Sequence, residues 1–207
     1  MGQSQFKGVQ IYDVIQDHDL NYWFATNEGL YVYDFYKYEK INCDEDKSNS
    51  VFGFKINKEG TIFCSNLNNQ IFQIKNKQCS LFYELDVEEG RPDINLSIGD
   101  DDNLIIAAKT LQVINKQGIK INQTKVNDRY IGPSFKTKLN ETIFHQSSID
   151  SIIIYSKGVF TFKQLTGLSK SYYNIEIAFN FFKLNNTSYA LDFKNKICYE
   201  FKESDFS

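Results

Sequence analysis

A pattern of strand-like segments and polar turns recurs about every 40 residues, and this period limits the possible folds more than any other feature. The first polar turn of successive copies ends at Asn21, Gly60 and Asn103, and again near Asp150 and Thr187. Four-stranded propeller blades repeat at roughly 40–50 residues, whereas helical repeats show an apolar period of about 3.6 residues. Because apolar residues here alternate at a period near two, each copy is predicted to be a small β-sheet.

A single four-stranded sheet cannot bury both of its faces, so each copy needs neighbours. Continuous apolar runs such as Leu104–Ala108 are typical of strands that are covered on both faces. We therefore predict an all-β chain that forms a β-propeller-like array of four to five four-stranded antiparallel blades, a partial propeller. It is expected to be a single domain over residues 1–207, with blades near residues 8–47, 48–90, 91–130, 131–172 and 173–207.

Four segments are expected to form the most buried strands, because each is a short apolar run between turn residues. They are Tyr22–Thr26, Thr61–Ser65, Leu104–Ala108 and Ile152–Tyr155. One residue in each should be nearly inaccessible to solvent: Trp23, Phe63, Ile105 and Ile153. For Trp23, the only tryptophan, packing in the core is favoured over stacking on a ligand.

The charge of the chain argues against a nucleic-acid partner. The net charge is -3, and only two of the cationic residues, Arg91 and Arg129, are arginines, the side chain best suited to gripping phosphate. No run approaches the ~20 apolar residues of a membrane-spanning helix. The polar start after Met1 lacks the apolar core of a signal peptide, so we expect a segment whose parent chain is exported and anchored through other parts.

The four cysteines show no metal-binding spacing. Cys64 and Cys198 lie inside strand-like runs and are expected to be small buried hydrophobic residues. Cys43 and Cys79 follow comparable strands in successive copies, so a disulfide between them is conceivable. Free thiols are favoured, because the sequence does not show the short Cα separation that a disulfide needs.

The first copy, from Asp17 to Asp34, resembles the repeat of the two-component regulator propeller family. The residues that fit that pattern, and for which a structural role is expected, are Asp17, Trp23, Thr26, Gly29, Leu30 and Asp34. Asn21 replaces the usual glycine of the turn, and the lead-in Ser48–Val51 is also similar to the family's segment before each blade. The later copies keep only the order and spacing of the strands and turns.

The resemblance implies a place in the extracytoplasmic sensor region of a hybrid two-component system or sensor histidine kinase. Family members place two seven-bladed propellers outside the membrane. An immunoglobulin-like domain, a membrane helix and a cytoplasmic kinase or DNA-binding output follow. The resemblance therefore implies a periplasmic module of an inner-membrane protein, whose full-length parent could be a histidine kinase.

No catalytic, cofactor-binding or metal-binding residue is expected. His18 and His145 have no fixed acidic partner in the sequence, and no nucleophile, phosphate-loop or zinc motif occurs. The acidic run Asp100–Asp102 could hold calcium, but it lacks the fuller spacing of a calcium loop. A hairpin turn of solvated carboxylates is the favoured interpretation.

The favoured function is ligand sensing or signal transmission, by binding and relay without catalysis. The alternatives are a protein-interaction propeller scaffold and, less favoured, a propeller-fold carbohydrate hydrolase or lyase. Expected partners are an oligosaccharide or another small ligand. Self-association through open blade edges is also expected, because uncovered sheet edges and faces drive association.

Overall fold

The computed structural model describes the backbone of residues 6–86, 94–126, 134–136, 140–146, 151–164, 179–184, 187–192 and 197–201. These residues form strands, turns and bends, and no helix occurs among them. The chain divides into two compact units, residues 1–98 and 99–207, which are described separately below.

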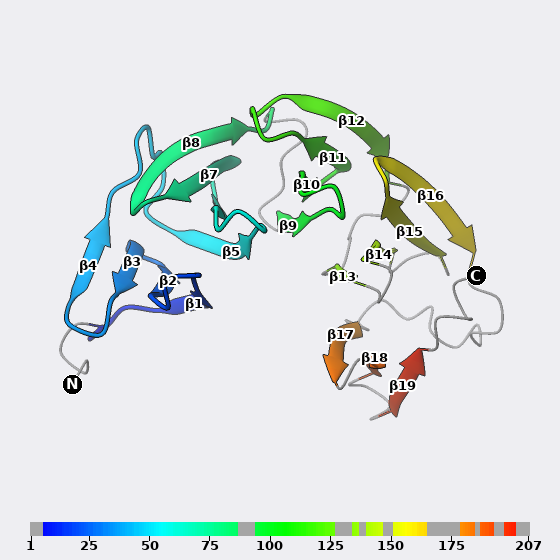
Figure 1. Cartoon of the computed structure of the whole chain (residues 1–207), viewed down its shortest axis with the longest axis horizontal. Helices are drawn as coiled ribbons and strands as arrows, with labels where there is room; N and C mark the ends of the chain where they lie inside the picture. Colours follow the sequence, from blue (N-terminus) through cyan, green and yellow to red (C-terminus); the bar gives the residue numbers. More distant parts are fainter. Residues whose placement is uncertain are drawn as a thin grey trace. The chain divides into compact units, whose positions relative to one another are not determined.

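The described residues form five sheets that follow one another along the chain, and consecutive strands pair within each sheet (Figure 1). The first sheet contains β1 (Ile11–Gln16), β2 (Tyr22–Thr26), β3 (Gly29–Tyr33) and β4 (Tyr38–Ile41). The second contains β5 (Val51–Ile56), β6 (Ile62–Asn66), β7 (Gln70–Lys75) and β8 (Gln78–Glu84). The third contains β9 (Asn95–Ile98), β10 (Leu104–Ala107), β11 (Thr110–Ile114) and β12 (Lys120–Lys125).

The fourth sheet contains β13 (Phe135–Lys136), β14 (Thr142–Gln146), β15 (Ser151–Ser156) and β16 (Val159–Gln164). The fifth contains three strands among the described residues, β17 (Phe179–Leu184), β18 (Thr187–Asp192) and β19 (Ile197–Phe201). Successive strands pair antiparallel in the first, second, fourth and fifth sheets. The predicted all-β class, with small antiparallel sheets, is therefore confirmed.

One type of five-residue turn joins strands at four places in the part of the chain that the structure describes. In the turn that begins at Asp17, the amide of the first residue donates to the carbonyl of the fifth, and the amide of the fourth donates to the carbonyl of the first. The same two bonds recur in the turns that begin at Asn57, Gly99 and Asn115. The fourth residue has a positive φ in each case, a conformation that glycine adopts most readily. These residues are Leu20 (φ 68), Gly60 (φ 82), Asp102 (φ 67) and Gly118 (φ 77).

This geometry corrects the assignment of Asn21 to the glycine position of the family repeat. The left-handed residue is Leu20, one position earlier, and Asn21 is the fifth residue of the turn. Asn21 instead supports the turn, because its amide nitrogen Nδ2 donates to Asp17 Oδ2 over 3.0 Å.

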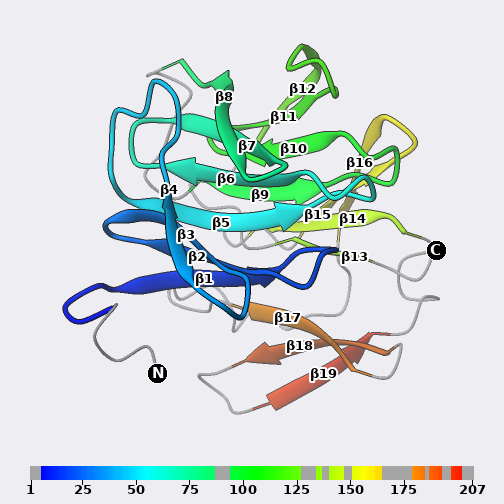
Figure 2. The same ribbon diagram turned by 60° about the vertical axis from the view of Figure 1, so that its left-hand side comes forward.

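In the first unit, the first and second sheets pack face to face through one apolar core, and Figure 2 shows the second sheet stacked on the first. β2 contributes Trp23 and Ala25, and β3 contributes Leu30 and Val32. The second sheet contributes Val51, Phe54, Ile62, Cys64, Phe72, Ile74 and Cys79. The carboxylate of Asp13 adds a polar link, since its Oδ2 accepts a hydrogen bond from the amide of Phe54 over 2.8 Å.

In the second unit, β10 and β11 of the third sheet share a comparable core with the fourth sheet. β10 and β11 contribute Ile105, Ala107, Leu111 and Val113, and the fourth sheet contributes Phe144, Ile153 and Tyr155. Burying each such side chain contributes roughly 1.5–3 kcal/mol, so facing sheets of this kind stabilise one another.

The most buried strands lie close to where the sequence predicts them. β2 has the predicted bounds, β6 is displaced by one residue, and β10 ends one residue earlier than expected. The exposed fraction is 2% for Trp23, 5% for Phe63 and 0% for both Ile105 and Ile153, so their predicted burial is confirmed. Trp23 is a core residue, as the favoured interpretation had it.

Candidate functional site

A disulfide joins the edge strands of the first two sheets. Cys43 follows β4, Cys79 lies in β8, and the two residues form an isolated parallel bridge. Their Cα atoms are 4.6 Å apart, and the amide of Asp44 donates to the carbonyl of Cys79 over 3.4 Å. The prediction of free thiols here is therefore wrong. Sheet packing brings residues 36 positions apart within disulfide range, which no local pattern reveals. Cys64 is a buried free thiol, as predicted.

A groove of about 640 Å³ lies beside this disulfide, between β4 with its following residues and β7 and β8. The two strands of the second sheet and the edge of the first supply its walls. Its lining is polar: Glu39, Lys40, Asn42, Asp44, Gln73, Lys75, Lys77, Gln78 and Ser80, together with Ile41 and Cys79. Most of these side chains are hydrogen-bond donors.

The groove has a small excess of positive charge, because three lysines face two carboxylates. One carboxylate, Glu39, is 3.3 Å from the ammonium of Lys37. The Lys40 ammonium is 5.9 Å from the centre of the Tyr31 ring, within cation–π range. Amide and ammonium donors in one open groove suit a hydroxylated ligand that carries an acidic group.

Asp34 contacts Lys77, one of the residues that line this groove. Its Oδ1 accepts hydrogen bonds from the amides of Lys37 (2.9 Å) and Tyr36 (3.1 Å), and its Oδ2 is 3.5 Å from the ammonium of Lys77. These backbone bonds, with a smaller contribution from Lys77, hold the pKa of the Asp34 carboxyl below its usual value. Asp34 thus fixes the turn between β3 and β4 and positions a groove lysine.

The other residues of the family pattern lie in the first sheet and its turns. Asp17 Oδ1 accepts hydrogen bonds from the amides of Asp19 (3.0 Å) and Asn21 (2.8 Å), and Asp17 Oδ2 accepts one from Trp23 Nε1 (2.8 Å). One carboxylate therefore shapes the turn and satisfies the polar atom of the buried indole.

Thr26, Gly29 and Leu30 form the tight connection between β2 and β3. The buried hydroxyl of Thr26 donates to the carbonyl of Gly29 over 2.7 Å and accepts from the amide of Glu28 over 3.1 Å. Gly29 has a φ of 112°, which a residue with a Cβ rarely adopts. Leu30 follows directly and enters the core with 1% exposure.

The acidic run Asp100–Asp102 is bound by protein groups of the second unit. Both carboxylate oxygens of Asp100 accept the amide of Lys157, at 3.1 and 2.9 Å. Asp102 is 8% exposed, and its Oδ2 is 3.3 Å from the ammonium of Lys116. The predicted turn is present, but the carboxylates of Asp100 and Asp102 contact protein groups, which come from hairpins that are distant in sequence.

Asp101, in the same turn, accepts a hydrogen bond from the hydroxyl of Tyr155 over 2.5 Å. The amide of Asn103 donates to the other oxygen of that carboxylate over 3.2 Å. Tyr155 is inaccessible to solvent, and burial raises the pKa of its phenol, with a further rise from the hydrogen bond to Asp101. The pair therefore joins β15 to the turn before β10 with a neutral phenol.

The described residues contain no group of three or more His, Cys, Asp or Glu side chains placed to hold a metal ion. His18 lies in the exposed turn after β1, beside Gly60, and the side chain of His145 is outside the described residues. In the part of the chain that the structure describes, no helix is long and apolar enough to cross a membrane.

No family model and no curated protein matches the sequence. Solved structures do resemble the fold. A catalytically inactive H270A virginiamycin B lyase from Staphylococcus aureus, crystallised with quinupristin, matches with a TM-score of 0.70 and 13% identity, over 94% of this chain and 70% of the lyase. The structures that match are propeller-like proteins.

Extracellular domains assigned to hybrid two-component systems of B. thetaiotaomicron also match. One has a TM-score of 0.64 at 13% identity, over 94% of this chain and 29% of that chain. Another has a TM-score of 0.63 at 13% identity, over 95% of this chain and 30% of that chain. The chain thus spans about a third of these extracellular domains. At such low identity the likeness shows the fold.

Proposed function

We propose that the chain is a ligand-sensing or signal-transmitting propeller module from the extracytoplasmic part of a membrane-bound two-component receptor of the two-component regulator propeller family. It acts by binding and relay, without catalysis. The Asp17–Asp34 repeat and the likeness to extracellular domains of two-component systems support this proposal.

The observation that carries the proposal is the polar groove that lies beside the Cys43–Cys79 disulfide. Structural disulfides persist in oxidising compartments, which supports a periplasmic or otherwise extracytoplasmic location. The disulfide also ties the segment after β4 to β8, so the strands that carry the polar side chains of the groove are held together before a ligand arrives. Preorganisation of this kind improves affinity, because less freedom is lost on binding.

The groove chemistry favours an acidic oligosaccharide as the ligand. Lys75 and Lys40 offer ammonium groups for a carboxylate, and Gln73 and Gln78 offer amides for hydroxyl groups. Nothing in this ligand class requires a metal or a nucleophile.

Calorimetric titration of the 207-residue chain with neutral and uronic-acid-containing oligosaccharides tests the proposal. We expect binding of an acidic oligosaccharide, weakened about tenfold or more by the double change Lys40→Gln and Lys75→Gln. Lys125→Gln is the matched control, because Lys125 lies on β12 of the second unit and does not line the groove. Absence of binding across the panel, or equal loss in the control, would contradict the groove as a ligand site.

The likeness to virginiamycin B lyase, at a TM-score of 0.70, favours a lyase as the second candidate. That function requires turnover rather than simple binding. Incubation of the chain with cyclic peptide and polysaccharide substrates, followed by mass spectrometry of the products, distinguishes the two. Turnover that is abolished by changing one carboxylate or histidine would replace the sensing proposal.

A further inference from the structure

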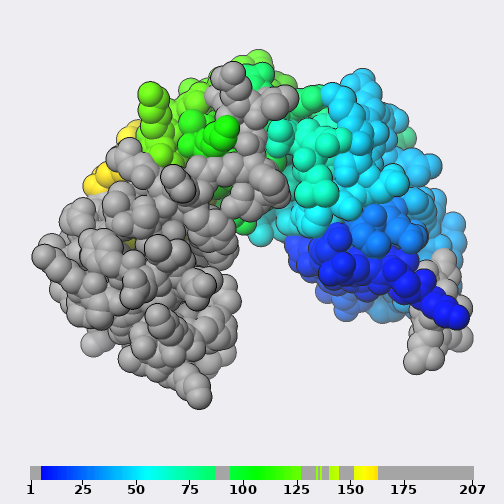
Figure 3. All heavy atoms as spheres, turned by 180° about the vertical axis from the view of Figure 1, so that it is seen from behind, coloured from blue at the N-terminus to red at the C-terminus, as the bar shows by residue number. Residues whose placement is uncertain are grey.

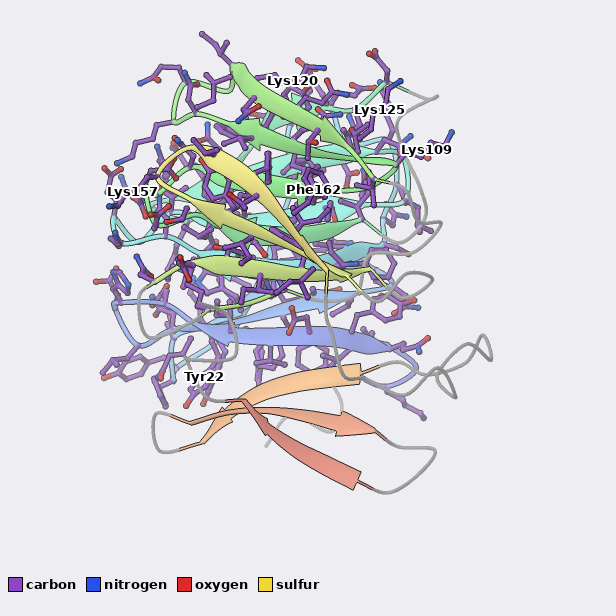
Figure 4. The ribbon with its side chains drawn as sticks, turned by 90° about the vertical axis from the view of Figure 1, so that its right-hand side faces the viewer. Tyr22, Lys109, Lys120, Lys125, Lys157 and Phe162 are labelled. Carbon is purple, nitrogen blue, oxygen red and sulfur yellow. A yellow bond between two sulfur atoms is a disulfide. The ribbon has the colours of Figure 1, made fainter. Side chains whose placement is uncertain are left out.

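The first sheet has one face that packs on the second sheet and one that does not. Side chains on the second of these faces come from alternate positions of the strands, as the registers of β1 with β2, β2 with β3 and β3 with β4 show. We call this the aromatic face and define it by its six residues: Val14, Tyr22, Phe24, Tyr31, Tyr33 and Tyr38. Figure 4 shows Tyr22 on the side of the first sheet that is turned away from the second.

The repeat identifies what this face corresponds to in the second sheet. Tyr22 pairs with Tyr33 across β2 and β3, and Ile62 pairs with Ile74 across β6 and β7 at the same distance from the five-residue turn. By the same register, Phe24 corresponds to Cys64, Tyr31 to Phe72 and Val14 to Phe54. The equivalents in the second sheet are therefore the residues that the first sheet covers.

The fourth sheet shows the same relationship within the second unit. Phe144 pairs with Ile153 and Thr142 with Tyr155, and these positions are fully buried where the third sheet packs on the fourth. In both units, then, this face receives the preceding sheet. It is an established sheet-to-sheet interface wherever a preceding sheet lies in the same unit.

Burial separates the first sheet from these equivalents. Val14 is 47% exposed, whereas its counterpart Phe54 is 3% exposed. Tyr22, Phe24, Tyr31 and Tyr33 are partly exposed, whereas Ile62, Cys64, Phe72 and Ile74 are buried. The residue types differ as well, because tyrosine tolerates water at its hydroxyl and still buries a large ring on contact. Side chains of this kind suit a partner that binds reversibly, and they are enriched at protein interfaces.

The face already accepts an aromatic ring from outside the sheet. The ring of Phe6, which precedes β1, lies 5.3 Å from that of Phe24, 5.5 Å from Tyr31 and 5.2 Å from Tyr38, measured between centroids. Tyr33 and Tyr38 stack at 4.3 Å. The rings thus form a continuous surface rather than isolated exposed residues. In the space-filling view of Figure 3, β1 (dark blue) lies at the surface of the first unit.

We propose that the aromatic face binds the aromatic face of a second copy of this chain, so that two first sheets pack face to face. In the second and fourth sheets the same register positions already mediate sheet packing, there against the opposite face of the preceding sheet. A two-fold arrangement lets one tyrosine-rich surface complement itself, and it is the commonest symmetry of homo-oligomers. Aromatic pairs add to the area buried.

Light scattering across a range of protein concentrations, with the 207-residue chain, tests the proposal. The mass of the wild-type chain should rise from 24.1 kDa toward twice that value. Val14→Lys should remain at the monomer mass, because two lysines would be buried in the interface. Val159→Lys is the matched control, since Val159 is 59% exposed in the second unit, and it should associate like the wild type. Thermal melting checks that both variants fold.

A second measurement distinguishes whether the aromatic face is covered by a second copy or by another segment of the same chain. In a Cys198→Ser background, the rate at which a thiol reagent labels Val14→Cys should fall as protein concentration rises. Supporting results are this fall together with the mass increase. A wild-type mass of 24.1 kDa at every concentration would overturn the proposal, as would labelling that is independent of concentration, whether fast or slow.

Discussion

The indole nitrogen of Trp23 donates a hydrogen bond to Asp17 Oδ2 over 2.8 Å and so ties the core of the first unit to the turn before β2. The same carboxylate accepts the amides of Asp19 and Asn21. The only tryptophan of the chain is thus both a packing residue and the partner of a turn-forming aspartate.

Trp23→Ala should lower the free energy of unfolding of the first unit by about 3–5 kcal/mol, because it leaves a cavity between two sheets. Urea denaturation followed by circular dichroism measures the loss. Tyr36→Ala, at a side chain that is 94% exposed, serves as the control and should change stability by less than about 0.5 kcal/mol. A loss below about 1 kcal/mol for Trp23→Ala would contradict its place in the core.

Leu20→Gly should stabilise the protein by about 0.5–1 kcal/mol. A left-handed conformation costs a non-glycine residue roughly 1–2 kcal/mol, and glycine removes this cost. Part of the gain in stability is lost, because glycine also gives the unfolded chain more conformational freedom. Leu20 is 61% exposed with a φ of 68°, so little packing is lost. The midpoint of urea denaturation measures the effect.

Gly60→Ala makes the reverse change at the equivalent turn position, since it replaces a left-handed glycine by a residue with a Cβ. It should destabilise the protein. Gly60 has a φ of 82°, and an added Cβ would lie 3.1 Å from His18 Nδ1. If both substitutions moved stability in the same direction, the equivalence of the two turns would be wrong.

Removing the disulfide by the double change Cys43→Ala and Cys79→Ala should cost about 3–4 kcal/mol, since it frees a loop of 36 residues in the unfolded chain. Thermal melting with and without a reductant measures this. The wild type should lose stability on reduction and the double variant should not respond. A wild type that is insensitive to full reduction would show that the crosslink contributes no stability.

Stability should fall at high pH through Tyr155. The pKa of Tyr155 is raised in the folded protein, so the neutral phenol contributes its full stabilisation below the usual tyrosine pKa of about 10. This stabilisation is lost as the pH rises through the folded pKa, because the tyrosine of the unfolded chain ionises at a lower pH than that of the folded protein.

Tyr155→Phe isolates this effect. At neutral pH the variant should be less stable by about 1–2 kcal/mol, because it loses the hydrogen bond to Asp101. Above pH 10 the difference from the wild type should shrink, since phenylalanine does not ionise. Unfolding curves at pH 7 and pH 10.5 test this, and a difference that grows with pH would refute the role of the phenol.

Local chemistry in the sequence was sufficient for the strands and the core. Short apolar runs ended by Asn, Asp and Gly fixed β2, β6, β10 and β15 to within a residue or two, because backbone pairing and turn formation depend on neighbours in the chain. The burial of Trp23 followed from the same pattern. The left-handed residue at Leu20 did not, because leucine gives no signal for that conformation.

Three features depended on packing between segments far apart in sequence. The Cys43–Cys79 disulfide, the groove beside it and the bond from Tyr155 to Asp101 each join different hairpins. The repeat predicts that the sheets stack. Strand propensity, however, does not predict which residues meet where two sheet edges come together. Those positions follow from how side chains of the first and second sheets, and of the third and fourth, fill the space between them, and only the tertiary structure contains that information.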